Sequence, residues 1–184
     1  RAMEIVYSQD QLIDYITRSA DVTAGHPILI DQFIEDAFEF DVDALCDGEE
    51  VYIGAIMQHI EEAGIHSGDS ACVLPPYQIK SSTMIVIEEI TTTLAIELNV
   101  IGLINIQFAY KNDMLYVLEV NPRASRTTPF VSKSTNVPLA KIAAQLSVGQ
   151  KLKNYNLPRW DSINHVSIKE AVLPFNKFPA ESIF

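Results

Sequence analysis

The sequence is poor in cysteine, and this shortage limits the class of protein. Cys46 and Cys72 are the only cysteines among 184 residues, and their spacing fits neither a zinc motif nor a redox pair. Two isolated thiols are typical of packing residues in a reducing compartment, so we expect a cytoplasmic protein. The seven glycines are also scattered, and none of them forms a Gly-rich loop that could cradle phosphates.

Positive charge and long apolar runs are scarce as well. The net charge is -11, whereas general nucleic-acid binding relies on a basic surface. No apolar run approaches the length needed to span a membrane, and no signal peptide is evident. We therefore expect no nucleic-acid or membrane partner. Because the chain opens on Arg1 and stops at Phe184, we expect an excised fragment of a longer protein.

The basic residues that are present gather in one segment. Residues 120–160 contain no Asp or Glu, yet they hold seven of the thirteen Lys and Arg residues. An acid-free basic segment in an acidic protein fits a local site for a small anion. Chance clustering of solvated side chains explains Lys151, Lys153 and Arg159 equally well, but it does not explain Arg123 and Arg126.

The hydrophobic pattern predicts antiparallel hairpins with helices between them, which is an α+β arrangement. A Ser8–Gln11 capping box predicts a helix to about residue 19, and Pro138 and Gly149 bracket another helix. Strands are expected at residues 4–7, 28–33, 38–46, 51–59, 103–110, 115–120 and 166–173, and helices at about 9–19, 82–99 and 139–148, with Ser81 or Ser82 as the cap of the second helix.

Two stretches of this pattern carry candidate site residues. Apolar and acidic residues alternate through 38–46, so Glu39, Asp41 and Asp43 share one strand face. From the alternation alone, that face is expected to be solvated. Residues 61–77 form a long loop whose apolar members favour order, and loops of this length inside compact domains are usually functional.

A run of β-forming residues ends at Glu119, Asn121 and Pro122 and is followed by Arg123 and Arg126. Residues two apart in a strand share a face, so the Glu119 and Asn121 side chains point the same way. Oxygen ligands of this kind suit Mg²⁺, and arginine suits phosphate or carboxylate. The alternative is a strand end followed by a solvated polar loop.

Gln107 lies one strand earlier and depends on the register of the hairpin. A two-residue turn at residues 112–113 would pair Gln107 with Leu118 and turn it away from Glu119. We predict an odd-length or bulged connection that places Gln107 directly across from Glu119, because a polar side chain facing away from the site would be hard to satisfy in a buried sheet. The alternative is an ordinary solvent-facing glutamine.

These residues resemble the metal and phosphate site of ATP-grasp enzymes, and more closely the large chain of carbamoyl phosphate synthetase. The resemblance covers essentially the whole chain. His66-Ser67-Gly68-Asp69-Ser70 and Pro129-Phe130-Val131-Ser132-Lys133 are similar to its second half, which phosphorylates carbamate. The other matching motifs are residues 1–7, 28–33, 39–44, 64–65, 121–127 and 172–179.

The resemblance implies an ATP-grasp fold with a mostly antiparallel sheet, flanking helices and a truncated first lobe. Residues 1–25 would be the remnant of that lobe, residues 26–150 the main lobe, and residues 151–184 a linker and strand toward the next domain. It also implies roles for eleven residues. Gln107, Glu119 and Asn121 would ligate two Mg²⁺ or Mn²⁺ ions, Arg123 and Arg126 would act on the transferring phosphoryl group, and Asp31, Glu39, Gly64, Ile65, His66, Ser67, Gln107 and Glu119 would bind ATP.

The implied activity is the phosphorylation of carbamate by ATP within a glutamine-hydrolysing carbamoyl phosphate synthetase. This enzyme is a ligase that feeds pyrimidine and arginine synthesis. The implied partners are the glutaminase small chain and the rest of the large chain. Because a Gly-rich phosphate loop is missing from residues 1–184, we expect weak nucleotide binding and incomplete turnover from this segment alone. Two alternatives stay open, another ATP-grasp ligase that makes an acyl phosphate and a non-catalytic nucleotide-binding module.

Overall fold

A computed structural model describes residues 4–23, 28–65 and 69–172, and the chain divides into two compact units, Arg1–Glu35 and Asp36–Phe184. The first unit contains helix α1 (Gln9–Thr23), which runs four residues beyond its expected end. The predicted capping box is present, because the Gln11 amide donates to Ser8 Oγ at 3.2 Å. The Gln11 side chain accepts from the Tyr7 amide at 2.8 Å.

The two strands predicted in the first unit are wrong. Residues 4–7 and 28–33 have no strand structure, and Leu29 and Ile30 are 83% and 58% exposed. A β-forming composition only favours a strand where a partner supplies the ladder of hydrogen bonds. Among the described residues of this unit, no such partner is present.

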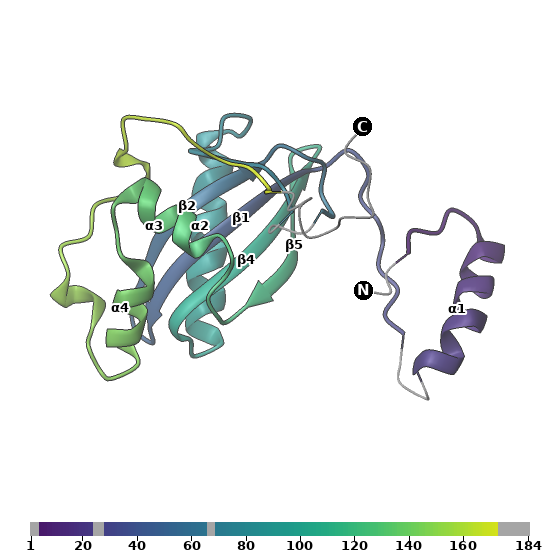
Figure 1. Cartoon of the computed structure of the whole chain (residues 1–184), viewed down its shortest axis with the longest axis horizontal. Helices are drawn as coiled ribbons and strands as arrows, with labels where there is room; N and C mark the ends of the chain where they lie inside the picture. The colour runs from purple at the N-terminus through teal and green to yellow at the C-terminus, as the bar shows by residue number, and fades with distance from the viewer. Residues whose placement is uncertain (1–3, 24–27, 66–68, 173–184) are drawn as a thin grey trace. The chain divides into compact units, whose positions relative to one another are not determined.

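The second unit is built on a six-stranded sheet with the order β5-β4-β1-β2-β3-β6, in which every neighbouring pair is antiparallel (Figure 1). The strands are β1 (Phe38–Asp47), β2 (Val51–His59), β3 (Cys72–Leu74), β4 (Ile101–Lys111), β5 (Met114–Asn121) and β6 (Ser167–Lys169). The last strand is much shorter than the predicted 166–173. The helices are α2 (Ser81–Glu97), α3 (Thr128–Thr135) and α4 (Leu139–Leu146), with short 3-10 turns η1 (Leu152–Asn154) and η2 (Trp160–Ser162).

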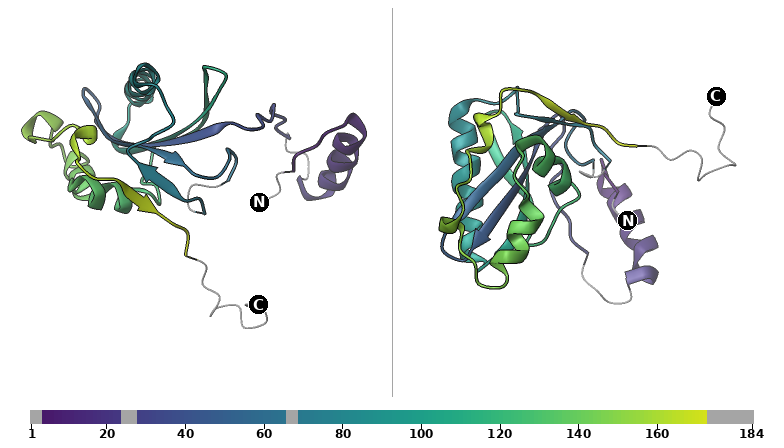
Figure 2. Two further views of the ribbon diagram at one scale, coloured as in Figure 1. Left: turned by 90° about the horizontal axis from the view of Figure 1, so that it is seen from above. Right: turned by 60° about the vertical axis from the view of Figure 1, so that its left-hand side comes forward.

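Helices cover both faces of this sheet. Helix α2 lies on one face, whereas α3 and α4 lie against the other (Figure 2). Phe40, Val42 and Ala44 are fully buried on the α2 side of β1. Because the opposite face of β1 is covered as well, nine of its ten residues are buried. Helix α2 begins after Lys80 without a side-chain cap, so the expected serine cap is wrong.

The β4–β5 hairpin has the bulge that the polar pattern predicts. Asn112 and Asp113 form a tight turn with φ of 52° and 61°, which suits a two-residue hairpin connection. The register then shifts, because Gln107 pairs with Glu119 whereas Phe108 pairs with Val117. Leu118 is therefore the extra residue, and Gln107 and Glu119 share a face of the sheet.

Candidate functional site

Three neighbouring strands place polar side chains on the sheet face that α3 and α4 partly cover. Asp41 of β1 pairs with Gln107 of β4, and Gln107 pairs with Glu119 of β5. Asn105 pairs with Asn121 one step further along. Side chains that lie directly opposite in antiparallel strands have Cβ atoms about 5 Å apart. The structure thus brings Gln107, Glu119 and Asn121 together, as the sequence predicts.

These side chains suit a hard cation. Gln107 is partly exposed and Glu119 is exposed, and within the described part of the chain neither side chain makes a hydrogen bond or ion pair. The Asn121 Nδ2 atom is buried and has no hydrogen-bond partner among the residues that the structure describes. One carboxylate and two amide oxygens form a donor set of the kind that Mg²⁺ or Mn²⁺ prefers. Among the described residues, no three His, Cys, Asp or Glu side chains form a metal cluster, so any metal here depends on the amides.

Two exposed arginines follow the end of β5. Arg123 donates from Nη2 to Asn121 Oδ1 at 3.2 Å and from Nη1 to the Ala124 carbonyl at 3.1 Å. Its guanidinium therefore lies beside the candidate metal ligands. Arg126 is exposed three residues later. Two cations next to a metal-binding edge could hold an anion that bridges them to a metal.

Glu39 is buried, and the expectation of a solvated carboxylate is wrong. Glu39 is 1% exposed, and its Oε2 atom accepts a hydrogen bond from the Gly64 amide at 2.9 Å. Burial raises the pKa of Glu39, although His59 and the Gly64 hydrogen bond oppose that shift. The loop predicted at residues 61–77 therefore contacts β1 at the Glu39 carboxylate. This contact brings Glu39, Gly64 and Ile65 close together.

His59 is a residue of this polar cluster that the sequence analysis does not single out. It lies between two buried carboxylates, with Nδ1 at 3.5 Å from Glu39 Oε1 and Nε2 at 3.7 Å from Asp41 Oδ2. Burial by itself would lower the pKa of His59, but Asp41, Cys72 and the charge of Glu39 together raise it to about 10. The ring is therefore an imidazolium at neutral pH and balances part of the acidic charge on β1.

The sequence analysis also does not identify Asp43 and Asn105 as residues of the site. Asp43 is fully buried and Asn105 is 2% exposed, and the Asn105 amide bonds to both Asp41 and Asp43. Burial and the nearby Asp41 raise the pKa of Asp43 to about 6. The sequence contains a signal for this cluster, since polar residues repeat every second position in both 39–43 and 105–107.

Three predicted site residues cannot be related to this group. Asp31 is exposed and belongs to the first unit, whereas the strands of the candidate site belong to the second. His66 and Ser67 lie outside the described residues. The nucleotide-binding roles of these three residues stay predictions.

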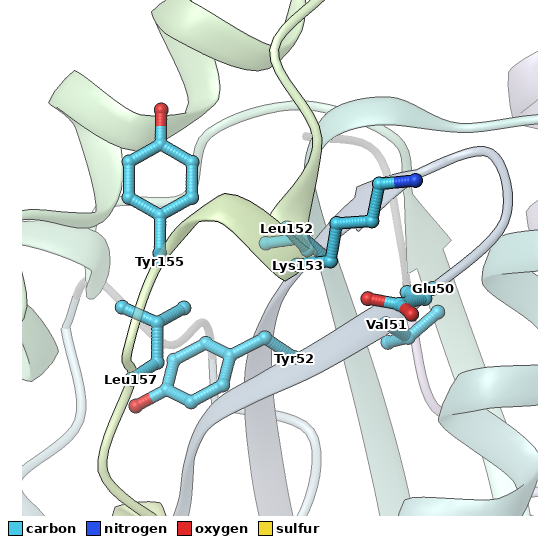
Figure 3. Close-up of a pocket in the computed structure, with 7 residues that line it drawn as sticks. All are labelled: Glu50, Val51, Tyr52, Leu152, Lys153, Tyr155 and Leu157. Carbon is cyan, nitrogen blue, oxygen red and sulfur yellow. The ribbon is translucent and has the colours of Figure 1, made fainter.

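A separate pocket lies near the β1–β2 hairpin turn, where Tyr52 of β2 and Tyr155 and Leu157 of the segment after η1 line it (Figure 3). The volume is about 210 Å³, whereas small-molecule sites usually measure about 300 Å³ or more. Along β1, the hairpin end at Cys46 lies five residues from Asp41. We therefore keep this pocket apart from the candidate site.

The fold is that of the ATP-grasp proteins. The chain is similar to the solved structure "Biotin Carboxylase domain of single-chain bacterial carboxylase", with a TM-score of 0.65 at 14% sequence identity. The match covers 90% of this chain and 44% of that chain. At this identity the likeness shows the fold alone.

Sequence comparison then defines the family. The family described as "Carbamoyl-phosphate synthase L chain, ATP binding domain" matches residues 1–155. The carbamoyl phosphate synthase large chain of Archaeoglobus fulgidus is 60% identical over 97% of this chain. A "Carbamoyl phosphate synthase large chain, C-terminal section" of Methanocaldococcus jannaschii is 53% identical, also over 97% of this chain. The chain belongs to this family.

This chain is short beside its relatives. It spans 17% of the Archaeoglobus fulgidus protein and 31% of the Methanocaldococcus jannaschii section. Within residues 4–23, 28–65 and 69–172, no helix combines the length and the hydropathy required to cross a bilayer.

Proposed function

We propose that this chain is part of the unit that uses ATP to phosphorylate carbamate in a carbamoyl phosphate synthase. The observation that carries the proposal is the bulged register that sets Gln107 opposite Glu119, with Arg123 bonded to Asn121 two residues further on. A strand pair with oxygen donors next to two arginines suits the handling of a phosphoryl group. The match to a C-terminal section supports the carbamate half over the bicarbonate half.

The candidate residues divide into three roles in this proposal. Gln107, Glu119 and Asn121 would hold two Mg²⁺ or Mn²⁺ ions. Such ions neutralise phosphate oxygens and so favour attack on the γ-phosphorus. Glu39 would accept hydrogen bonds from the ribose hydroxyls, and Gly64, Ile65, His66 and Ser67 would line the edge of the nucleotide pocket. Asp31 would lie beside the adenine.

Phosphoryl transfer requires no nucleophile from the protein. A carbamate oxygen attacks the γ-phosphorus, its bond to the phosphorus forms, and the bond from phosphorus to the bridging oxygen of ADP breaks. Arg126 and Arg123 would hold the carbamate and the equatorial oxygens during this exchange. Their positive charge stabilises the charge that spreads over those oxygens.

The intact enzyme would be of the glutamine-hydrolysing type. A glutaminase small chain would supply ammonia, and the remainder of the large chain would supply the bicarbonate half. Residues 1–25 would be a remnant of the first ATP-grasp lobe, and residues 151–184 would lead toward the next domain. The product would feed pyrimidine and arginine synthesis in the cytoplasm.

The test is ATP formation from MgADP and carbamoyl phosphate by a complete large chain that carries this segment. We expect Glu119→Ala to lower the rate by at least about 100-fold, which is typical for the loss of a group that stabilises transition-state charge. Glu97→Ala, at an exposed position at the end of α2, is the matched control and should keep the parent rate. Equal rates in both variants would refute the metal role of Glu119. A folded parent without activity would refute the carbamate assignment.

A further inference from the structure

The arginines are carried by a short segment, residues 122–127, that we call the arginine loop. Ser125 stands between Arg123 and Arg126, and its side chain points into the protein rather than to solvent, because Ser125 Oγ lies 2.7 Å from Asp43 Oδ1. Thr127 reaches the other oxygen of the same carboxylate, with Oγ1 at 2.7 Å from Asp43 Oδ2. One buried carboxylate on β1 thus receives both hydroxyls of the loop.

The loop also folds around Ser125 itself. The amides of Thr127 and Thr128 donate to Ser125 Oγ at 3.1 and 3.0 Å. Thr127 precedes α3 and Thr128 is its first residue, and amides at a helix start need acceptors because they have no partner within the helix. Thr127 occupies the N-cap position, yet it makes no capping bond with its own side chain. Its hydroxyl is bonded to Asp43 instead, so Ser125 accepts from the helix start.

These contacts join distant parts of the chain. Asp43 lies 82 residues before Ser125 and 84 residues before Thr127, so local backbone preference does not explain them. Asp43 is fully buried in the middle of β1, a strand paired on both sides. Hydrogen bonds from hydroxyls to a buried carboxylate are stronger than bonds between neutral groups. The loop is therefore bonded to a buried interior strand of the sheet.

The same carboxylate is linked to the candidate metal ligands. Asn105 Nδ2 donates to Asp43 Oδ1 at 3.1 Å, and Asn105 is the residue opposite Asn121 across the β4–β5 pair. Asn121 in turn accepts from Arg123. A path of contacts thus connects Asp43 to the metal-binding edge as well as to the arginine loop.

We propose that Asp43 is a positioning residue that anchors the arginine loop through Ser125 and Thr127 and so sets the positions of Arg123 and Arg126 for the phosphoryl group. The proposal rests on the proposed function for the role of the arginines, but the anchoring itself can be measured without any turnover. Loss of the anchor should raise the KM for the phosphorylated substrate more than it changes the Kd of the nucleotide.

The test removes one hydroxyl from the network. Thr127→Val in a complete large chain keeps the side-chain volume and deletes the bond to Asp43. Thr135→Val is the matched control, because Thr135 is also buried in α3 and, among the described residues, its hydroxyl bonds only within its own helix, to the Val131 carbonyl at 2.9 Å. Thr127→Ser retains the hydroxyl and serves as the rescue variant. Should Thr127→Val fail to fold, Ser125→Ala replaces it.

Two readouts decide the result. In ATP formation from MgADP and carbamoyl phosphate, we expect Thr127→Val to raise the KM for carbamoyl phosphate about tenfold, since small displacements of positioning groups have effects of this size. The Kd of MgADP should stay within about twofold, and Thr127→Ser should restore most of the parent KM. Hydrogen exchange of the Thr128 amide should become about tenfold faster in Thr127→Val and stay unchanged in Thr135→Val.

The outcomes separate the two proposals. Unchanged exchange at Thr128 in a folded Thr127→Val protein would overturn the anchor, as would an equal rise of KM in Thr135→Val. A parent that forms no ATP from carbamoyl phosphate would overturn the proposed function only. Faster exchange confined to Thr127→Val would in that case still support the anchoring of the loop by Asp43.

Discussion

Replacement of His59 by glutamine should destabilise the second unit by an amount that shrinks as the pH rises. The ring is buried between Glu39 and Asp41, with nitrogen–oxygen distances of 3.5 and 3.7 Å. Glutamine keeps a polar side chain of similar size but carries no positive charge. The variant therefore leaves two buried carboxylates close together without a cation between them, which is a costly arrangement.

The pKa of His59 gives the size and the sign of the pH dependence. Asp41, Cys72 and Glu39 raise it from 6.5 to about 10, against the lowering effect of burial. Because the folded pKa lies above the unfolded one, the stability from protonated His59 is fully present below pH 6.5 and is lost as the pH rises through 10. Each pH unit in this window corresponds to about 1.4 kcal/mol, so the difference between parent and variant should fall by about 3 kcal/mol from pH 7 to pH 9.

The assay is urea unfolding at pH 7, 8 and 9, followed by tryptophan fluorescence. Trp160 is the only tryptophan, is 2% exposed, and lies in the same compact unit as His59. Its Nε1 donates to Glu88 Oε1 at 2.7 Å, so unfolding of this unit changes the surroundings of the ring. His165→Gln is the matched control, because His165 is exposed and, within the described part of the chain, its ring bonds only to the Ser134 carbonyl.

One result would refute this reasoning. If His59→Gln differs from the parent by the same free energy at pH 7 and pH 9, the imidazole does not gain a proton on folding. The two carboxylates would then share a proton or admit water, and the charge balance inferred for β1 would be wrong. The pKa of Asp43 is raised to about 6, so a comparison that starts at pH 7 avoids most of its titration.

Two further variants test the packing around the site. Gly54→Ala should lower the free energy of unfolding by about 1–3 kcal/mol, because the new Cβ would lie 2.8 Å from the Asp43 carbonyl oxygen and 3.0 Å from a Leu139 methyl group; an unchanged urea midpoint would show that β1 and α4 can move apart. Thr91→Val should raise it by about 1 kcal/mol, because within the described residues the buried Thr91 hydroxyl has no hydrogen-bond partner; a lower thermal midpoint would indicate an interior water on that hydroxyl.

The register of the β4–β5 hairpin could be predicted from the sequence because it follows from a local constraint. A two-residue turn at Asn112 and Asp113 would turn Gln107 away from Glu119, and only a bulge or a longer turn reverses this. The structure contains both the tight turn and the bulge. The spacing of the polar residues and the chemistry of the turn were together sufficient to predict that Gln107 lies opposite Glu119.

Burial of the acids on β1 could not be predicted in the same way. The alternation through residues 38–46 is the pattern of a strand with one wet face, and it contains no information about a distant segment that covers that face. The cover for Asp43 comes from Ser125 and Thr127, more than 80 residues away. The strand predicted at residues 28–33 is wrong for a related reason. An apolar run does not by itself show which strand would pair with it.

The negative charge of the buried acids on β1 is partly offset by side chains of the same unit. Glu39, Asp41 and Asp43 lie on the face where a nucleotide would bring several negative charges, and unbalanced carboxylates would repel it. His59 contacts the first two, and the hydroxyls of the arginine loop bond to the third. The His59 imidazolium offsets part of this negative charge, and the hydroxyls stabilise the Asp43 carboxylate by hydrogen bonds without neutralising it. Arg123 and Arg126 are exposed after β5, and in the proposed function their positive charges would stabilise the phosphoryl group during its transfer.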